Sequence, residues 1–172
     1  MAMKTDTLWA PHRLGYLRGL KRNRKAGRTP PCFLCAALRD RRRDALLLER
    51  GRHAFCVLNK FPYNIGHLMV VPNRHTADYA TLTPPELTEM GRLTQAYLKV
   101  LRKLFQPDGF NLGVNLGSAA GAGLETHLHL HLVPRWTADT NFVTVLGGAR
   151  VISMTLLDLK ERLQAMRRRP RR

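Results

Sequence analysis

Three histidines alternate with three leucines between residues 127 and 132, and this pattern most strongly limits what the chain can fold into. Side chains of a β-strand point alternately to opposite faces, so His127, His129 and His131 are expected on one face and the leucines on the other. Three titratable rings gain nothing from burial in an ordinary core, because each must be desolvated. The alternation therefore predicts a strand with a functional face.

A glycine-rich stretch precedes this strand and runs from Gly117 to Gly123. It follows an expected strand over residues 110–116, so the chain is predicted to form two antiparallel strands joined by this stretch. Backbone amides in such a loop suit an anion such as phosphate. The combination of strand, loop and histidine strand indicates a site that handles phosphate.

Two further regions are expected to add strands to the same sheet. Residues 46–49 and 53–58 are apolar segments separated by Arg50–Arg52, which predicts a hairpin. Residues 67–71 predict another strand, which Pro72 ends because proline has no amide donor. Together with the two strands around the glycine-rich stretch, these segments predict an antiparallel sheet of about five strands.

Helices are expected in three segments of the chain. The clearest begins at the capping-box spacing of Thr83–Glu86, after which apolar residues repeat at helical spacing to Phe105. A short helix is expected over residues 36–43, after a turn at Cys32–Cys35, and a C-terminal helix over residues 155–166. The fold class is therefore α+β, with the helices on one side of the sheet.

Length and charge limit the number of domains and the kinds of partner. At 172 residues the chain predicts one domain over residues 31–166, with a basic N-terminal arm over 1–30 and a basic tail over 167–172. A formal net charge of +17 attracts anions in general, whether nucleotides, polyphosphate or RNA. The sequence shows neither a signal peptide nor an apolar run of membrane-spanning length, so a cytoplasmic protein with no membrane partner is expected.

The order of the three histidines indicates their roles. Attack on phosphorus requires a neutral imidazole whose second nitrogen has its proton held by a hydrogen-bond acceptor. His129 is flanked on both sides by a histidine of its own face, which makes it the expected nucleophile. His131 is the expected neighbour that binds or protonates phosphate oxygens, and His127 is the third member of the expected catalytic set.

The cysteines divide into a pair and a single residue. Cys32 and Cys35 form a Cys-x-x-Cys pair, whereas Cys56 lies in an apolar run and is expected in the core. Such a pair with two histidines is a common tetrahedral zinc set, and two reduced thiols without metal are the alternative. His67, which follows Gly66, is expected to be an ordinary histidine of the sheet.

Residues 127–133 resemble the motif that defines the histidine triad (HIT) superfamily of nucleotide hydrolases and transferases. Similar segments recur from about residue 8 to residue 150, and their order makes the resemblance more specific than the motif alone. They resemble the bacterial diadenosine tetraphosphate phosphorylase-like branch and comprise Leu8–Pro11, Cys32–Cys35, Leu58–His67, Val71–His75, Gly109–Gly117 and Pro134–Phe142.

The resemblance implies a HIT-like fold and an enzyme that cleaves dinucleoside polyphosphates of the diadenosine tetraphosphate type. His129 is expected to form a nucleotidyl-histidine intermediate by attack on the α-phosphorus, and phosphate or water then releases the nucleotide. Turn chemistry is the alternative role for the two asparagines among the expected contacts. These contacts are Asn115, Gly117 and Ser118 for the phosphate, and Asn59, Phe55 and Leu58 for the nucleoside.

The chain departs from the family pattern at two positions. Leu130 stands where members of this branch commonly have glutamine. Leu124 stands near the position where other branches have a serine or threonine that contacts phosphate, and Thr126 is expected to replace it only in part. The phosphate contacts outside the three histidines are therefore the least specific of the expected contacts.

The resemblance also implies a structural zinc that is not required for catalysis, and a homodimer. The expected zinc ligands are Cys32, Cys35, His75 and His127, and the alternative for His75 is that it caps a turn. Two other functions remain open. One is a nucleoside phosphoramidase or adenylyl hydrolase with the same nucleophile, and the other is a non-catalytic basic protein that binds RNA or polyphosphate, against which the intact triad argues.

Overall fold

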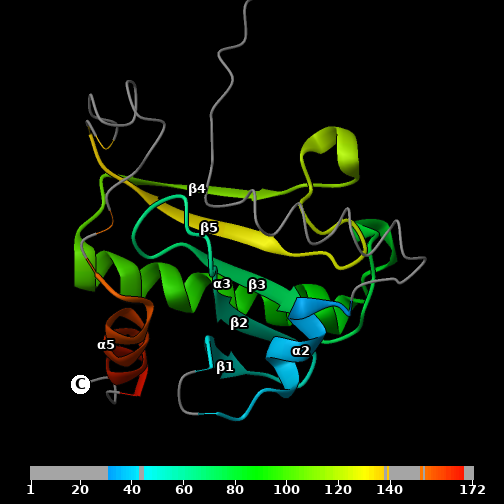
Figure 1. Cartoon of the computed structure of the whole chain (residues 1–172), viewed down its shortest axis with the longest axis horizontal. Helices are drawn as coiled ribbons and strands as arrows, with labels where there is room; N and C mark the ends of the chain where they lie inside the picture. Colours follow the sequence, from blue (N-terminus) through cyan, green and yellow to red (C-terminus); the bar gives the residue numbers. More distant parts are fainter. Residues whose placement is uncertain (1–30, 43–44, 138, 140–151, 153, 169–172) are drawn as a thin grey trace, which may run out of the picture. The chain divides into compact units, whose positions relative to one another are not determined.

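The computed structural model describes residues 31–42, 45–137, 139, 152 and 154–168 (Figure 1). Within these residues, five strands form one antiparallel sheet in the order β1-β2-β3-β5-β4, which confirms the expected sheet. The expected strand bounds differ from the observed ones by at most three residues. The strands are β1 (Leu47–Arg50), β2 (Ala54–Leu58), β3 (Leu68–Pro72), β4 (Gly109–Val114) and β5 (Leu130–Arg135).

The long helix α3 (Pro84–Phe105) begins where the sequence predicts it. Thr83 is its N-cap, and the capping box with Glu86 is present because Glu86 accepts a hydrogen bond from the Thr83 amide at 2.8 Å. The C-terminal helix α5 (Leu156–Arg168) extends two residues beyond the expected end at residue 166. Two short 3-10 helices, η2 (Tyr79–Thr81) and η3 (Ser118–Ala120), lie in the connections.

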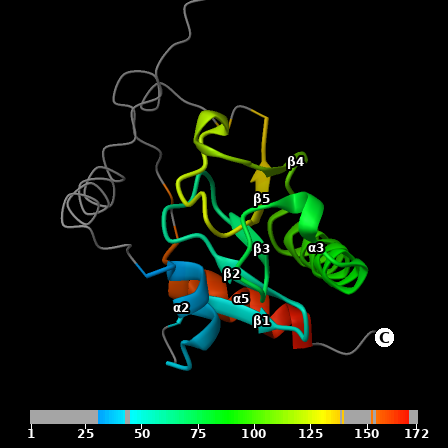
Figure 2. The ribbon, with the colours of Figure 1, turned by 90° about the vertical axis from the view of Figure 1, so that its right-hand side faces the viewer.

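Helices α3 and α5 cover one face of the sheet and enclose the larger hydrophobic core (Figure 2). Leu93 and Tyr97 of α3 are buried there against strand residues such as Leu68. The leucines that alternate with the histidines also belong to this side, since Leu128 and Leu132 are buried in the same core. The apolar half of the alternating pattern is therefore confirmed.

The short helix α2 (Phe33–Arg39) lies on the opposite face, so the expectation of helices on one side only is wrong. Leu34 of α2 is fully buried against Phe55 and Met69. Cys32 is the N-cap of this helix, and its sulfur accepts the Cys35 amide at 3.5 Å. The Cys-x-x-Cys pair thus forms the N-cap and first turn of a helix that ends at Arg39, rather than a turn before a later helix.

The histidine strand is shorter than expected, because β5 begins at Leu130. Pro72 of the neighbouring strand has no amide to donate to a ladder. Its carbonyl accepts a hydrogen bond from the His127 side chain rather than from a strand amide. The Leu128 amide donates to the Thr76 carbonyl at 2.7 Å. His127 and His129 therefore lie in an extended approach to β5 that is held by the 72–76 loop, and only His131 lies in the ladder.

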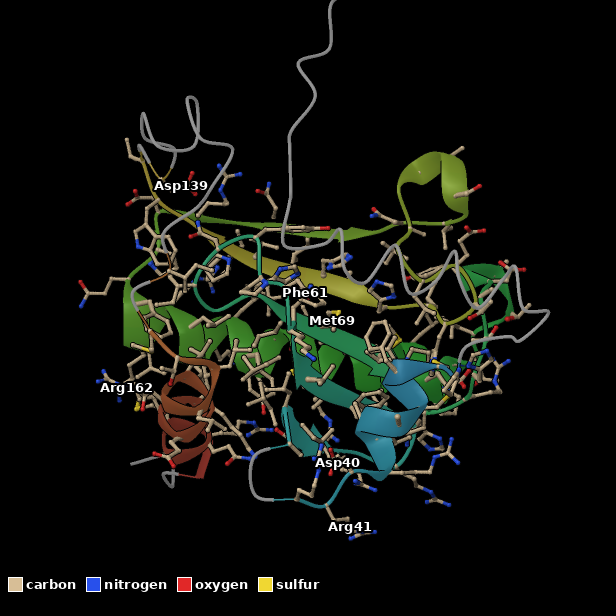
Figure 3. All side chains as sticks on the ribbon, viewed as in Figure 1. Asp40, Arg41, Phe61, Met69, Asp139 and Arg162 are labelled. Atoms are coloured by element: carbon tan, nitrogen blue, oxygen red, sulfur yellow. The ribbon has the colours of Figure 1, made fainter. Side chains whose placement is uncertain are left out.

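Several segments named in the sequence analysis lie outside the described residues. These are the basic arm over 1–30, most of the Asp139–Phe142 segment, and residues 169–172 of the tail. Among the described basic residues, Arg41 and Arg162 point away from the sheet (Figure 3). No helix in the described part of the chain is long and apolar enough to cross a membrane.

Candidate active site

The histidine side chains occupy the face of the sheet opposite α3. His131 pairs with Met69 across β3 and β5, and with Gly113 across β4 and β5. Paired residues of an antiparallel ladder share a face, so His131 lies on the face of Met69, whose side chain packs with the α2 residues. Phe61 and Met69 mark this region in Figure 3. The functional half of the alternating pattern is thus on the side that the sequence predicts.

His129 has the tautomer that a phosphorus nucleophile needs. Its Nδ1–H donates a hydrogen bond of 2.9 Å to the backbone carbonyl of His127, so the lone pair is on Nε2. Burial lowers the pKa of His129 below its ordinary value of 6.5, and the ring is neutral at pH 7. Within the described residues, Nε2 has no hydrogen-bond partner. The residue is only 7 % exposed, so a substrate can contact it only through that small exposed part.

His67 forms a hydrogen-bonded pair with His131. The Tyr63 amide donates to Nδ1 of His67 at 3.0 Å, so His67 carries its proton on Nε2. That nitrogen lies 2.9 Å from Nδ1 of His131, which places the His131 proton on Nε2. The rings of His129 and His131 have centroids 4.8 Å apart. The lone pair on Nε2 of His129 and the fixed N–H of His131 therefore belong to neighbouring rings.

Sequence reasoning missed His67, which it assigned to the sheet as an ordinary residue. The residue is fully buried and lies two positions before Met69, so it shares the face of Met69 and His131. The available signal in the sequence was this two-residue spacing between His67 and Met69 of the third expected strand, which places both side chains on one face. Its significance depends on β3 lying beside β5, which sequence spacing does not reveal.

Asn59 makes the turn contacts that were the alternative to nucleoside binding. Its Oδ1 accepts the Phe61 amide at 2.9 Å, and its Nδ2 lies 3.4 and 3.5 Å from the two ring nitrogens of His67. Nearly equal distances mean that the amide lies against the ring rather than along a lone pair. Phe55 lies on the histidine face but is fully buried under α2, whereas Leu58 lies in the α3 core on the other face. The structure does not bring Leu58 to the histidines.

The glycine-rich loop starts at the strand that flanks His131. Asn115 follows β4 and is half-buried, while Gly117 and Ser118 are exposed. Gly117 has a φ of 76°, a left-handed conformation that favours glycine. The apolar Leu124 is partly buried against the cluster of Leu34, Phe55 and Met69, so its side chain packs in the fold.

A second cluster lies at the other end of the histidine segment. Sγ of Cys32 lies 3.3 Å from Nδ1 of His127, and Sγ of Cys35 lies 3.4 Å from the same atom and 3.3 Å from Nδ1 of His75. The four ligand atoms all lie within 4.8 Å of one another. Tetrahedral zinc with bonds of about 2.3 Å to sulfur and about 2.0 Å to nitrogen sets S···N separations of about 3.6 Å. The four residues named from the sequence therefore fit a zinc ion.

The backbone fixes the His127 ring for metal binding. Its Nε2–H donates to the Pro72 carbonyl at 3.0 Å, which leaves the Nδ1 lone pair directed at the thiols. Burial lowers the pKa of His127, with smaller contributions from His75 and His129, so the ring is neutral as a ligand must be. Cys56 is fully buried in the other core, as expected, and takes no part.

The His75 ligand is carried by a loop that is tied to α3. Arg74 donates two hydrogen bonds to Glu86, at 3.0 and 2.9 Å, and a third to the Thr81 carbonyl at 2.8 Å. The hydrogen bonds from Arg74, with those from Thr83, lower the pKa of Glu86 to about 2. This ion pair holds the backbone on which His75 projects toward the cysteines.

Comparisons with known proteins identify the family to which the chain is similar. Residues 41–138 match the model of the HIT domain. The chain is 41 % identical over 160 residues to the AP-4-A phosphorylase of Mycobacterium tuberculosis, covering 91 % of this chain and 81 % of that protein. It is 34 % identical over 90 residues to the asymmetrical bis(5'-nucleosyl)-tetraphosphatase of Schizosaccharomyces pombe, covering 52 % of this chain and 49 % of that protein.

A solved structure supports the fold. The zinc-bound histidine triad family protein of Mycobacterium smegmatis superposes with a TM-score of 0.64 at 25 % identity, covering 80 % of this chain and 93 % of that one. The family model spans more than half of the chain, and its range contains all three histidines of the alternating segment. The chain belongs to the HIT domain family.

Proposed function

We propose that this HIT protein is an enzyme that cleaves dinucleoside polyphosphates of the diadenosine tetraphosphate type through a nucleotidyl intermediate on His129. The observation that carries the proposal is the hydrogen bond from Nδ1 of His129 to the His127 carbonyl, which leaves a neutral Nε2 lone pair in the site. The relatives named AP-4-A phosphorylase and bis(5'-nucleosyl)-tetraphosphatase support the substrate class.

The first step transfers a nucleotidyl group to the protein. Nε2 of His129 forms a bond to the α-phosphorus, and the bond from that phosphorus to the bridging oxygen of the remaining polyphosphate breaks. The leaving oxygen departs as a phosphate oxygen that takes no proton. The Nε2–H of His131 donates a hydrogen bond to it and stabilises its developing charge, and the pair with His67 holds that N–H in place. Asn115, Gly117 and Ser118 are proposed to contact the phosphate oxygens, and Asn59 to contact the nucleoside.

The second step releases the nucleotide by attack of an acceptor oxygen on the same phosphorus. Orthophosphate as acceptor yields a nucleoside diphosphate, and water yields a nucleoside monophosphate. The 41 % identity to a protein named AP-4-A phosphorylase favours orthophosphate. In both cases the bond from phosphorus to His129 breaks and the ring returns to its neutral form.

Product analysis tests this proposal directly. The protein is incubated with diadenosine tetraphosphate with and without orthophosphate, and the nucleotides are separated by chromatography. ADP and ATP that form only when orthophosphate is present support phosphorolysis, whereas AMP and ATP formed without it support hydrolysis through the same intermediate. No cleavage under either condition contradicts the proposed function.

We also propose that Cys32, Cys35, His75 and His127 hold a structural zinc. The distances among their ligand atoms and the fixed tautomer of His127 support this, as does the zinc-bound relative of the same fold. All four positions of a tetrahedral ion are filled by protein atoms, so the metal supplies rigidity and no bound water for the reaction. The catalytic groups are then the histidines alone.

A homodimer is the proposed assembly. Strand β4 is an edge of the sheet, and Leu112 on it and Leu116 beyond it are about half exposed. An edge strand with exposed leucines is typically covered by a partner. Light scattering on the purified protein tests this, since a mass of twice 19.6 kDa is expected and the mass of one chain contradicts it.

A further inference from the structure

The loop between β2 and β3 determines which nitrogen of His67 carries the proton. The Tyr63 amide of this loop is the donor to Nδ1 of His67, and the Tyr63 ring lies over the His67 ring with centroids 4.7 Å apart. A backbone N–H can only donate, so the position of this amide decides the tautomer. Whatever fixes the loop therefore also fixes the proton positions of the His67–His131 pair.

Asn64 ties this loop to the strand that carries His131. Its Nδ2 donates to the carbonyl of Pro134 in β5 at 3.3 Å, and its Oδ1 accepts the Ile65 amide at 3.1 Å. Its own carbonyl accepts the His67 amide at 3.2 Å. One residue thus connects the backbone of Ile65 and His67 to a point three residues after His131.

Gly66 makes a second contact at the same proline. It has a φ of 77°, and a Cβ added there would lie 2.9 Å from the Leu101 side chain and 3.1 Å from Pro134. The loop therefore packs closely on β5 and α3 at this point. Asn64 and Gly66 hold the loop on one side and the Asn59 turn holds it on the other.

We propose that Asn64 is a positioning residue for the reaction, because its tie to β5 holds the Tyr63 amide on His67 and thereby keeps the His131 proton on Nε2. This inference rests on the proposed function, in which that N–H donates a hydrogen bond to the leaving oxygen. Without the tie, the Tyr63 amide moves from Nδ1 of His67 and the proton exchanges between the two ring nitrogens. His131 then loses its defined donor and presents a lone pair to the substrate in part of the molecules.

The first test reads the tautomer without any turnover. Imidazole nitrogen NMR spectra of the zinc-loaded protein are compared for wild type, Asn64→Ala and the control Gln164→Ala. Gln164 also donates a side-chain amide to a strand carbonyl, that of Leu48 at 3.1 Å, but it lies on α5 in contact with β1. Asn64→Ala is expected to move the Nδ1 signal of His67 away from that of an unprotonated nitrogen, and Gln164→Ala is not. An unchanged Nδ1 signal in Asn64→Ala overturns the proposal.

The second test uses the leaving group. In Asn64→Ala, kcat for diadenosine tetraphosphate is expected to fall by about 10–100-fold, with KM changed less than about threefold, because a hydrogen bond to the charge that develops on the leaving oxygen contributes about 10²–10³-fold and is lost in part of the molecules. A p-nitrophenyl ester of a nucleoside monophosphate spreads the charge of its leaving oxygen over the ring and the nitro group, so it should lose much less. Equal losses on both substrates contradict the assignment and indicate a general effect on the fold.

Two outcomes separate this inference from the proposed function. Asn64→Asp keeps the acceptor for the Ile65 amide and removes the donor to Pro134, so it is expected to behave like Asn64→Ala. Wild-type behaviour of Asn64→Asp contradicts the role of the β5 tie. If the NMR result is as expected while His129→Ala still turns over substrate, the positioning of His67 stands and the nucleophile assignment fails.

Discussion

His127 and His131 are four residues apart on one face, yet their surroundings differ in every contact. The His127 ring lies among two thiols and the His75 imidazole, with its N–H bound to a carbonyl. The His131 ring lies between His67 and His129, and it accepts a hydrogen bond from His67. The same residue type thus serves two kinds of chemistry within one short segment.

The difference shows how the backbone assigns roles to identical side chains. At His127 the Pro72 carbonyl accepts the N–H, so the remaining lone pair faces the two thiols, as the proposed metal ligand requires. At His131 the lone pair is used by His67, so the remaining Nε2–H is a hydrogen-bond donor. His129 stands between them, and its N–H is bound to the carbonyl of His127.

The largest effects are expected for substitutions of His131 and His127, the two histidines compared above. His131→Ala is predicted to lower kcat by about 10²–10³-fold, since it removes the hydrogen-bond donor to the leaving oxygen, and to leave zinc content unchanged. The main effect of His127→Ala is predicted to be a lower zinc content. Steady-state kinetics and elemental analysis of both variants check this, and loss of zinc in His131→Ala contradicts the separation of the two ends.

The metal end is tested by its cysteines. Cys35→Ser is predicted to reduce bound zinc and to lower the free energy of unfolding by about 3 kcal/mol, as expected for loss of a ligand present at a few hundred times its Kd. Cys56→Ala is the control, because this buried thiol lies outside the cluster. Denaturant unfolding with and without a chelator checks both. Less than a quarter equivalent of zinc in the wild-type protein removes the metal proposal.

Two glycines with nearly the same backbone conformation test how tightly the loop before His67 is packed. Gly66 and Gly117 have φ values of 77° and 76°, but only at Gly66 would an added Cβ meet other atoms. Gly66→Ala is predicted to cost about 2–3 kcal/mol and Gly117→Ala about 1 kcal/mol, because both pay backbone strain and only the first is also overpacked. Thermal unfolding checks the difference, and equal losses of stability contradict the tight packing of the His67 loop.

The smallest effect concerns the loop that carries His75. Glu86→Gln is predicted to lower the free energy of unfolding by about 1–2 kcal/mol at pH 7, because it removes the charged partner of Arg74. The folded pKa of Glu86 is lowered from 4.5 to about 2. Its contribution is therefore fully present above pH 4.5 and is lost as the pH falls toward 2.

Unfolding curves between pH 7 and pH 2 check this prediction. The difference between wild type and Glu86→Gln should shrink only below pH 4.5. Zinc release to a chelator should be faster in the variant, while kcat stays near that of the wild type. Slow zinc release together with a reduced kcat in Glu86→Gln would contradict this prediction, because the ion pair would then support the catalytic histidines rather than the metal cluster.

The sequence predicted those parts of the site that depend on local spacing. The alternation placed His129 and His131 on one face, and the Thr83 capping box located the start of α3. The face of α2 and the role of His67 could not be predicted, because both depend on which elements lie side by side. β3 and β5 are neighbours although α3 and β4 separate them in the chain. The bounds of β5 were wrong because side chains and the 72–76 loop replace ladder contacts there.

The nucleophile is the residue on which the proposed chemistry depends, and one measurement addresses it. The protein is mixed with diadenosine tetraphosphate in the absence of orthophosphate, quenched in alkali to preserve the phosphorus–nitrogen bond, digested and examined by mass spectrometry. An adenylyl group on His129 of wild type, and none in a folded, zinc-loaded His129→Ala variant without turnover, is the predicted result. An adduct on His127 or His131, or turnover by His129→Ala, would contradict it.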